Sequence, residues 1–201
     1  MRKISFDFDH KKATQAINFF ALKQGGHINE MKALKLIYFA DRYHLRKYGR
    51  LVTNDTYFAM DNGPVPSGAK DIAEGSSFLG KVEKEYSAGY LKKKDSYTLF
   101  SLKPLDTGVF SDSDIEALNF AWERFGKFGQ FDLAKLTHRY PEWSRHESAL
   151  RNVASRKQMN LTDFLDDPTK NAEKCFALTD EDRTLRREQI EEMAELEALW
   201  S

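Results

Sequence analysis

The sequence contains a single cysteine, Cys175, in 201 residues. One thiol cannot form an internal disulfide, and low cysteine usage fits a reducing compartment. No apolar run approaches the roughly 20 residues that a membrane-spanning helix needs. The N-terminal residues interrupt their apolar side chains with acids and lack the apolar segment of a secretory signal. These absences argue against a disulfide-stabilised, secreted or membrane-spanning protein, and we expect a soluble cytoplasmic one.

Recognised catalytic motifs are missing as well. The chain has no G-x-S-x-G nucleophile turn, no G-x-x-x-x-G-K-[ST] phosphate loop and no G-x-G-x-x-G dinucleotide fingerprint. It also lacks H-E-x-x-H and C-x-x-C, so a zinc site has no local sequence support. We therefore predict no catalytic residue, no metal ligand and no cofactor. Catalytic side chains can still converge from distant positions, which keeps an enzyme as an open alternative.

Three pairs of side chains represent that alternative. They are Asp41 with His44, His138 with His146, and Lys174 with Cys175. Asp41 and His44 are three residues apart on one expected helix, a spacing that suits a metal pair or an acid–base pair. Because no third ligand accompanies them, we interpret both as packed or hydrogen-bonded residues. We favour a structural interpretation of the other two pairs also, with Cys175 as a half-buried thiol.

Basic and acidic residues balance at 31 each, so net charge gives no argument for a nucleic-acid partner. The distribution is uneven, with basic clusters at 42–50 and 92–94 and an acidic C-terminal segment. Tyrosines near the first cluster are of the type that stacks on bases. However, extended sequence follows Gly49, where a helix-turn-helix motif would place a second helix. We expect solvated helix faces, and nucleic-acid binding is only a secondary alternative.

An apolar helix is the clearest structural signal, predicted from Glu30 to Tyr48. Asn29 has the side chain of an N-cap residue, and Gly49 stands where a left-handed C-terminal residue belongs. Two apolar stripes run along this helix. Their members are Met31, Leu34, Tyr38, Leu45 and Tyr48 on one stripe, and Ile37, Ala40 and His44 on the other. Together they cover more than half of the circumference, so we expect protein to surround the helix on most sides.

Other elements follow from caps, turns and apolar spacing. We predict helices at 11–23, 66–74, 112–125, 131–140, 143–153, 160–166 and 179–200. The S-x-x-D pattern at Ser111 predicts the start of the third, and Gln130 or Asp132 would cap the fourth. A strand at 56–60 would end in a turn at 62–64, and residues 81–91 and 96–102 would pair as a β-hairpin.

The predicted fold class is α+β, mainly α: a compact helical domain with a small antiparallel hairpin or sheet. We expect residues 1–160 to form this globular domain and residues 161–201 to form a C-terminal helical extension packed on it. The last helix has a thin apolar stripe and charged flanks. Docking on its own domain is favoured, while pairing with a second copy or with a partner's groove stays open.

A series of short motifs spans residues 28 to 145. Its members are Lys35 and Leu36; Tyr38, Phe39 and Ala40; His44 and Leu45; Gly49, Arg50 and Leu51; Tyr57, Phe58 and Ala59; Gly63, Pro64 and Val65; and finally His138 and Trp143. In this order they resemble the Panacea (SocA-like) antitoxin domain, which occurs in bacterial and phage-associated proteins. The resemblance covers most of the chain.

The resemblance implies an antitoxin that binds a toxin protein encoded beside it and neutralises it, as in type II toxin–antitoxin systems. One SocA-like branch acts instead as an adaptor that delivers its partner to an ATP-dependent protease, and this role is our first alternative. The implied partner is a cognate toxin, with a protease in the adaptor case. A homo-oligomer remains open.

We expect the partner to contact the segment around the predicted Gly-Pro turn. The candidate contact residues are Tyr57, Phe58, Asp61, Asn62, Pro64, Arg46 and Arg50. Aromatic side chains near a rigid turn make good binding anchors, and arginines add electrostatic steering. The remaining motif residues, on the central helix and at His138 and Trp143, are expected to support the fold.

Overall fold

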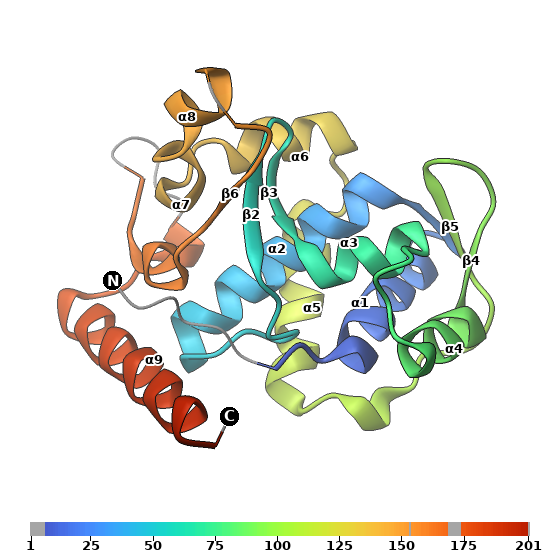
Figure 1. Ribbon diagram of the computed structural model, residues 1–201, viewed down its shortest axis with the longest axis horizontal. Coiled ribbons are helices and arrows are strands. Elements are labelled where there is room, and N and C mark those ends of the chain that lie inside the picture. Colours follow the sequence, from blue (N-terminus) through green and yellow to red (C-terminus); the bar gives the residue numbers. More distant parts are fainter. Residues whose placement is uncertain (1–6, 153, 169–173, 201) are drawn as a thin grey trace.

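The computed structural model describes residues 7–152, 154–168 and 174–200 (Figure 1). Three helices form its centre: α1 (His10–Lys23), α2 (Glu30–Tyr48) and α5 (Asp112–Phe125). They pack against one another, and α2 makes its most extensive contact with α5. Two small antiparallel sheets accompany them. The predicted class, α+β and mainly α, is confirmed.

Helix α2 has the ends that the sequence predicts. The Asn29 side chain accepts a hydrogen bond from the Lys32 backbone N–H at 3.1 Å, and Gly49 adopts the left-handed conformation with φ of 78°. Every residue from Lys32 to Arg46 except Tyr43 is buried. Neighbouring elements therefore surround α2 as expected, among them α1, α5, α6 (Gln130–Thr137) and the 3-10 helix η2 (Leu161–Leu165).

The two sheets differ in how far the sequence predicts them. One has the strand order β1 (His27–Asn29), β5 (Thr98–Ser101) and β4 (Leu91–Lys93); the other has the order β3 (Gly63–Pro66), β2 (Tyr57–Met60) and β6 (Lys157–Gln158). The strand predicted at 56–60 is confirmed as β2. Strands β1 and β6 were not predicted, because they are too short to show the alternation of apolar and polar residues that indicates a strand. Gly63 and Pro64 belong to β3 and not to the turn, which consists of Asp61 and Asn62.

The prediction of a strand at 81–91 is wrong, because residues Lys81–Tyr90 form helix α4. The Gly80 backbone N–H donates to Glu83 Oε2 at 2.6 Å, which satisfies a free donor at the helix start. Tyr86 and Tyr90 are four residues apart and lie on one helix face, with ring centroids 5.1 Å apart. Helix α4 packs against α1, and the Gln15 side chain donates to the Tyr86 hydroxyl.

Several other helices begin or end where expected. Helix α3 (Ser67–Glu74) ends at left-handed Gly75, and α5 starts with a capping box between Ser111 and Asp114. Helix α6 is capped by Gly129, so the predicted caps at Gln130 and Asp132 are wrong. The single helix predicted for 143–153 is also wrong. Two short helices replace it, α7 (Pro141–Ser144) and α8 (Glu147–Asn152), and position 153 lies outside the described residues.

The C-terminal part consists of η2, the 3-10 helix η3 (Lys174–Phe176) and helix α9 (Asp180–Trp200); a further 3-10 helix, η1 (Thr107–Val109), precedes α5. Phe164, Leu165, Phe176 and Ile190 are buried in the same hydrophobic core as α1 and α2. Helix α9 lies along one edge of the molecule (Figure 1). None of the helices in the described ranges has the length and apolar character needed to cross a membrane.

Candidate partner-recognition site

The turn between β2 and β3 projects two polar side chains from an otherwise buried hairpin. Asp61 and Asn62 are exposed, whereas all of β3 is buried. Gly63 has φ of 96°, and a Cβ at this position would collide with the Thr137 hydroxyl oxygen. Glycine is required here for both reasons, and the turn is thereby pressed closely against α6.

Side-chain hydrogen bonds, one buried and one part-buried, hold both strands of this hairpin. Lys35 Nζ on α2 donates to the Pro64 carbonyl oxygen at 2.6 Å, and Trp143 Nε1 on α7 donates to the Met60 carbonyl oxygen at 2.8 Å. The His138 ring stacks on Trp143 with centroids 3.7 Å apart. We call Lys35, His138 and Trp143 the hairpin clasp. Motif residues that are far apart in the sequence therefore converge on one backbone element.

Burial lowers the pKa of Lys35 to about 7, because a charged ammonium loses its hydration inside the protein. The side chain is only 1% exposed. Lys35 also lowers the pKa of His138, although burial of that imidazole is the larger cause. The clasp thus combines an amine that is partly neutral near neutral pH with a stacked imidazole.

Asp41 anchors the base of the hairpin. Its Oδ1 accepts from the backbone N–H groups of Val52 and Thr53, and its Oδ2 accepts from the hydroxyls of Thr53 and Tyr57. Burial raises the pKa of Asp41 to about 6, while these donors act in the opposite direction. Tyr57 is consequently only 3% exposed, so its side chain is a support for the hairpin and is not at the surface.

A buried ion pair lies beneath the clasp. Arg42 Nε is 2.8 Å from Glu142 Oε1, the same oxygen accepts from the Tyr38 hydroxyl, and both charged side chains are fully buried. The Arg42 guanidinium also lies over the Tyr140 ring, 4.4 Å from its centroid. Breaking such a pair leaves an uncompensated buried charge. The sequence pattern did not identify Glu142, although its position between Pro141 and Trp143 was a usable signal.

Arg46 is also buried and is committed to internal contacts. Its guanidinium donates to the carbonyl oxygens of Phe176 and Phe164 and pairs with Asp167 at 2.5 Å. Burial lowers its pKa to about 10, so it stays charged at neutral pH. Arg46 therefore joins α2 to the C-terminal segment and offers no surface for electrostatic steering.

His44 contacts a set of partners that differs from that of Asp41. Its Nδ1–H donates to the Arg50 carbonyl oxygen at 2.8 Å, and Nε2 lies 3.0 Å from Ser113 Oγ and 3.4 Å from Asp114 Oδ1. Burial lowers its pKa to about 4, so the imidazole is neutral at neutral pH. Within the described ranges, no three His, Cys, Asp or Glu side chains are arranged to hold a metal ion.

The predicted contact residues divide into an exposed and a buried set. Tyr57, Pro64 and Arg46 are buried, and Arg50, about one third exposed, pairs with Asp114 at 2.9 Å. Asp61 and Asn62 are exposed and Phe58 is partly exposed. An exposed residue that the sequence did not suggest joins them, because the Arg156 guanidinium lies 5.2 Å from the Phe58 ring centroid. We call Phe58, Asp61, Asn62 and Arg156 the hairpin tip.

The geometry is that of a mainly helical scaffold that fixes and presents a β-hairpin. Residues 34–144 match the family described as antitoxin SocA-like, Panacea domain. The match covers more than half of the chain, and the protein belongs to this family. No match was found among curated proteins or among solved structures. Membership supports an antitoxin-type, non-enzymatic role and implies a toxin partner in general terms.

Proposed function

We propose that this protein neutralises its cognate toxin by direct protein–protein binding and that the hairpin tip contacts the toxin. Family membership supports the antitoxin role. The observation that carries the choice of surface is the combination of an exposed tip with side-chain hydrogen bonds from α2 and α7 to both strands behind it. A surface held in one conformation loses little entropy on binding.

The chemistry of the tip suits protein recognition. Phe58 offers an aromatic face next to the Arg156 guanidinium, and aromatic residues and arginine are enriched among residues that dominate binding energy. Asp61 and Asn62 add a carboxylate and an amide that can pair with polar groups of the toxin. The buried Tyr57 and Arg46 act indirectly, because they hold the hairpin and the neighbouring C-terminal segment in place.

Co-expression with the neighbouring open reading frame tests this proposal. We expect growth arrest when the neighbour is expressed alone, rescue by the wild-type chain, and co-purification of the two proteins. The combined variant Phe58→Ala, Asp61→Ala, Arg156→Ala should lose both rescue and co-purification. The matched control Ser77→Ala, Glu85→Ala changes exposed residues on and near α4 and should behave as wild type. Full rescue by the tip variant at equal protein level would remove this surface from the proposal.

The toxin's steady-state level separates binding from delivery to a protease. Under our proposal the toxin remains at the same level when the antitoxin is present, since it is held and not degraded. In the adaptor alternative, the level falls with the antitoxin present and recovers in cells that lack the ATP-dependent protease. An immunoblot of a tagged toxin measures this difference.

A further inference from the structure

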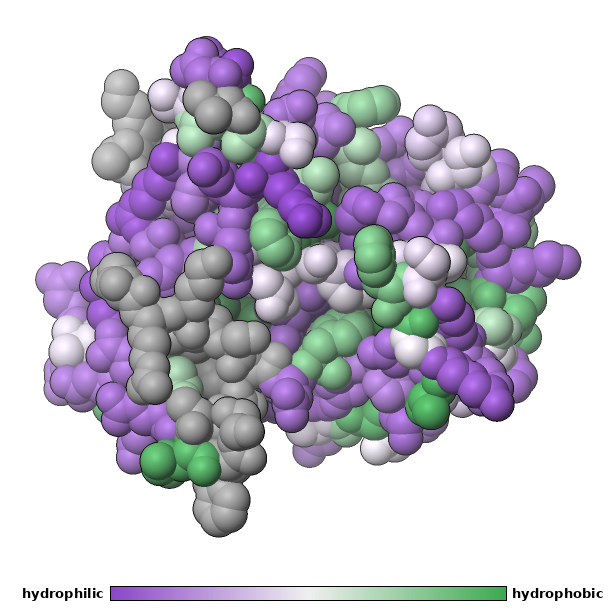
Figure 2. All heavy atoms as spheres, viewed as in Figure 1, coloured by the Kyte–Doolittle hydropathy of each residue, from purple (hydrophilic) through white to green (hydrophobic). Residues whose placement is uncertain are grey.

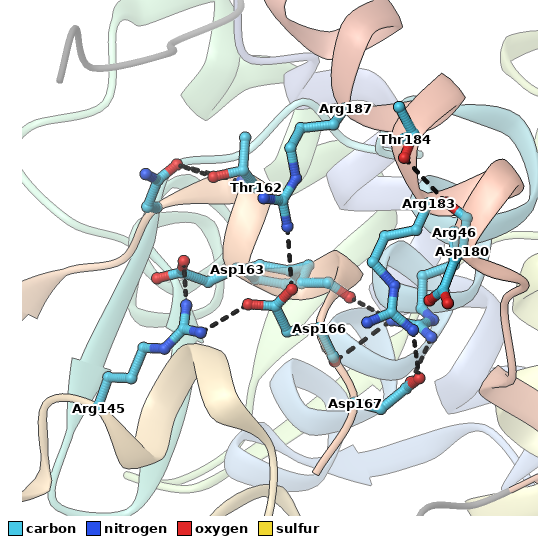
Figure 3. A network of polar contacts seen from close by, with 12 residues as sticks. Arg46, Arg145, Thr162, Asp163, Asp166, Asp167, Asp180, Arg183, Thr184 and Arg187 are labelled. Atoms are coloured by element: carbon cyan, nitrogen blue, oxygen red, sulfur yellow. Dashed lines mark hydrogen bonds and ion pairs between the residues drawn. The ribbon is translucent and has the colours of Figure 1, made fainter. Parts of the chain in front are cut away.

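Helix α9 is attached to the rest of the protein through one face only. Arg183 pairs with Asp167 at 2.7 Å and Arg187 pairs with Asp166 at 3.0 Å (Figure 3). On the same side, Ile190 is fully buried. These contacts orient α9 and leave its opposite face without a neighbour among the described residues.

The outward face carries apolar side chains. Leu185, Leu196 and Leu199 are 47%, 52% and 79% exposed, and Met193 beside them is 40% exposed. Spacings of eleven and three residues place the leucines on one side of a helix. Figure 2 shows a hydrophobic group near the C-terminal end of α9 on a face that is otherwise mostly hydrophilic. Exposed leucines one turn apart, as Leu196 and Leu199 are, with Met193 beside them, indicate a contact surface.

Carboxylates flank Leu196 and Leu199 without a lysine or arginine beside them in the sequence. From residue 188 to the end, the sequence has five acids and no lysine or arginine. Glu188, Glu191, Glu192 and Glu195 are all exposed. We call this surface, with Leu185, Met193, Leu196 and Leu199, the acidic stripe. Its occupant must therefore offer an apolar centre within a basic surround.

A surface of that description exists on the same molecule. An open depression of about 640 Å³ lies between the C-terminal end of α5 and α6. Four bases line it against two acids: Arg124, Lys127, Lys135 and Arg139 against Glu123 and Asp132. Phe128 and Leu136 also line it, and Phe128 is 37% exposed. We call this surface the basic depression.

The acidic stripe cannot reach the basic depression of its own chain while α9 is docked. In Figure 1, α9 lies at the lower left of the view and α6 at its top. The arginines that hold α9 are on its other face. Contact between the two complementary surfaces thus requires two molecules.

We propose that this protein self-associates by seating the acidic stripe of one copy in the basic depression of another. Leu196 and Leu199 would meet Phe128 and Leu136, while glutamates on the stripe pair with Lys135 and Arg139. If two copies exchange the two surfaces reciprocally about a two-fold axis, the interface is isologous and closes at two copies; without that exchange the contact is heterologous and continues to further copies. This inference goes beyond the proposed function and does not depend on the toxin.

Charge reversal on the full-length chain tests the proposal. One variant carries Glu192→Lys and Glu195→Lys, and the other carries Lys135→Glu and Arg139→Glu. Sedimentation velocity over a concentration series should show association of the wild type, and association weaker by roughly tenfold or more for each variant alone. A mixture of the two variants should associate again, because each chain then meets an oppositely charged surface.

A charge control and an apolar variant accompany the two charge-reversal variants. The variant Glu74→Lys, Glu85→Lys changes the net charge equally at exposed positions elsewhere and should associate as wild type. Leu196→Ser with Leu199→Ser should weaken association at every salt concentration, while the charge contribution should shrink as salt increases. A wild type that stays monomeric, or a mixture that fails to restore association, would overturn the proposal. Loss of toxin co-purification with an unchanged monomer would instead assign the stripe to the toxin.

Discussion

The hairpin and helix α9 are both fastened to α2 and its surroundings, but by different kinds of contact. The hairpin is held by buried groups, since Lys35 is 1% exposed and Trp143 is 5% exposed. Helix α9 is held by one fully buried side chain, Ile190, and by ion pairs near solvent, in which the Arg187 side chain is 43% exposed. Buried hydrogen bonds are little affected by salt, whereas ion pairs near solvent are screened. The hairpin is therefore a fixed part of the scaffold, and α9 is its more adjustable part.

Shortening the chain from its C-terminal side should change the stability more than any other variant considered, and by different amounts at two end points. Ending the chain before Leu161 removes Phe164, Leu165 and Phe176 from the core, and each buried side chain contributes about 1.5–3 kcal/mol. We expect the shortened protein to be unfolded, since native stability is only about 5–15 kcal/mol. Ending it before Asp180 removes α9 alone and should leave a cooperative thermal transition at a lower temperature. Circular dichroism measures both, and a folded 1–160 fragment would contradict this view of the core.

Removing the tryptophan of the clasp should have the next largest effect. Trp143→Ala deletes the ring that stacks on His138 and bonds the Met60 carbonyl oxygen, and it should lower the free energy of unfolding by about 3–5 kcal/mol. Trp143→Phe keeps a ring and should cost clearly less. Urea denaturation followed by circular dichroism provides the values. Equal effects of the two variants would show that the hydrogen bond, and not the ring, holds the hairpin.

The free energy of unfolding should depend on pH through Lys35 of the clasp. The pKa of Lys35 falls from 10.5 to about 7 on folding, so the unfolded chain binds more protons between these values. Stability contributed by this group must therefore rise as the pH increases from about 7 to 10.5. Lys35→Met lacks this titration, and the wild type should gain stability relative to it across that range. Parallel pH profiles of the two proteins would contradict the burial argument.

The smallest expected effect concerns the attachment of α9. Asp166→Asn weakens the ion pairs with Arg187 and Arg145, and exposed pairs of this kind contribute about 0–1 kcal/mol. The loss should appear at low salt and vanish at high salt. Asp41→Asn is the buried counterpart, and its larger cost should not depend on salt, because its partners are the internal groups of Thr53 and Tyr57. A salt-independent loss for Asp166→Asn would erase the distinction between the two regions.

Local sequence signals predicted most of the helical framework. The caps at Asn29 and Ser111 and the glycines at 49 and 75 mark helix ends that the structure confirms. These signals act within one turn of backbone, so they can be read without knowing the fold. The strand predicted at 81–91 is wrong, and the helix found there packs against α1.

The candidate site was predictable in position but not in detail. The sequence pointed to the segment from Tyr57 to Val65, and within it the turn residues Asp61 and Asn62 are exposed. It could not show that Tyr57 turns inward to Asp41 or that Arg156 lies beside Phe58. Those contacts join residues that are far apart in the chain or on opposite sides of a strand.

Local sequence is sufficient to specify the helical framework and the buried central helix, because apolar spacing and capping residues act over a few neighbouring positions. Tertiary structure alone decided which polar side chains are anchors and which face solvent. Lys35, Asp41 and Arg46 look like ordinary charged residues of a helix, yet each is buried against a partner from a distant segment. Burial depends on what the folded chain places opposite a residue, and no local pattern carries that information.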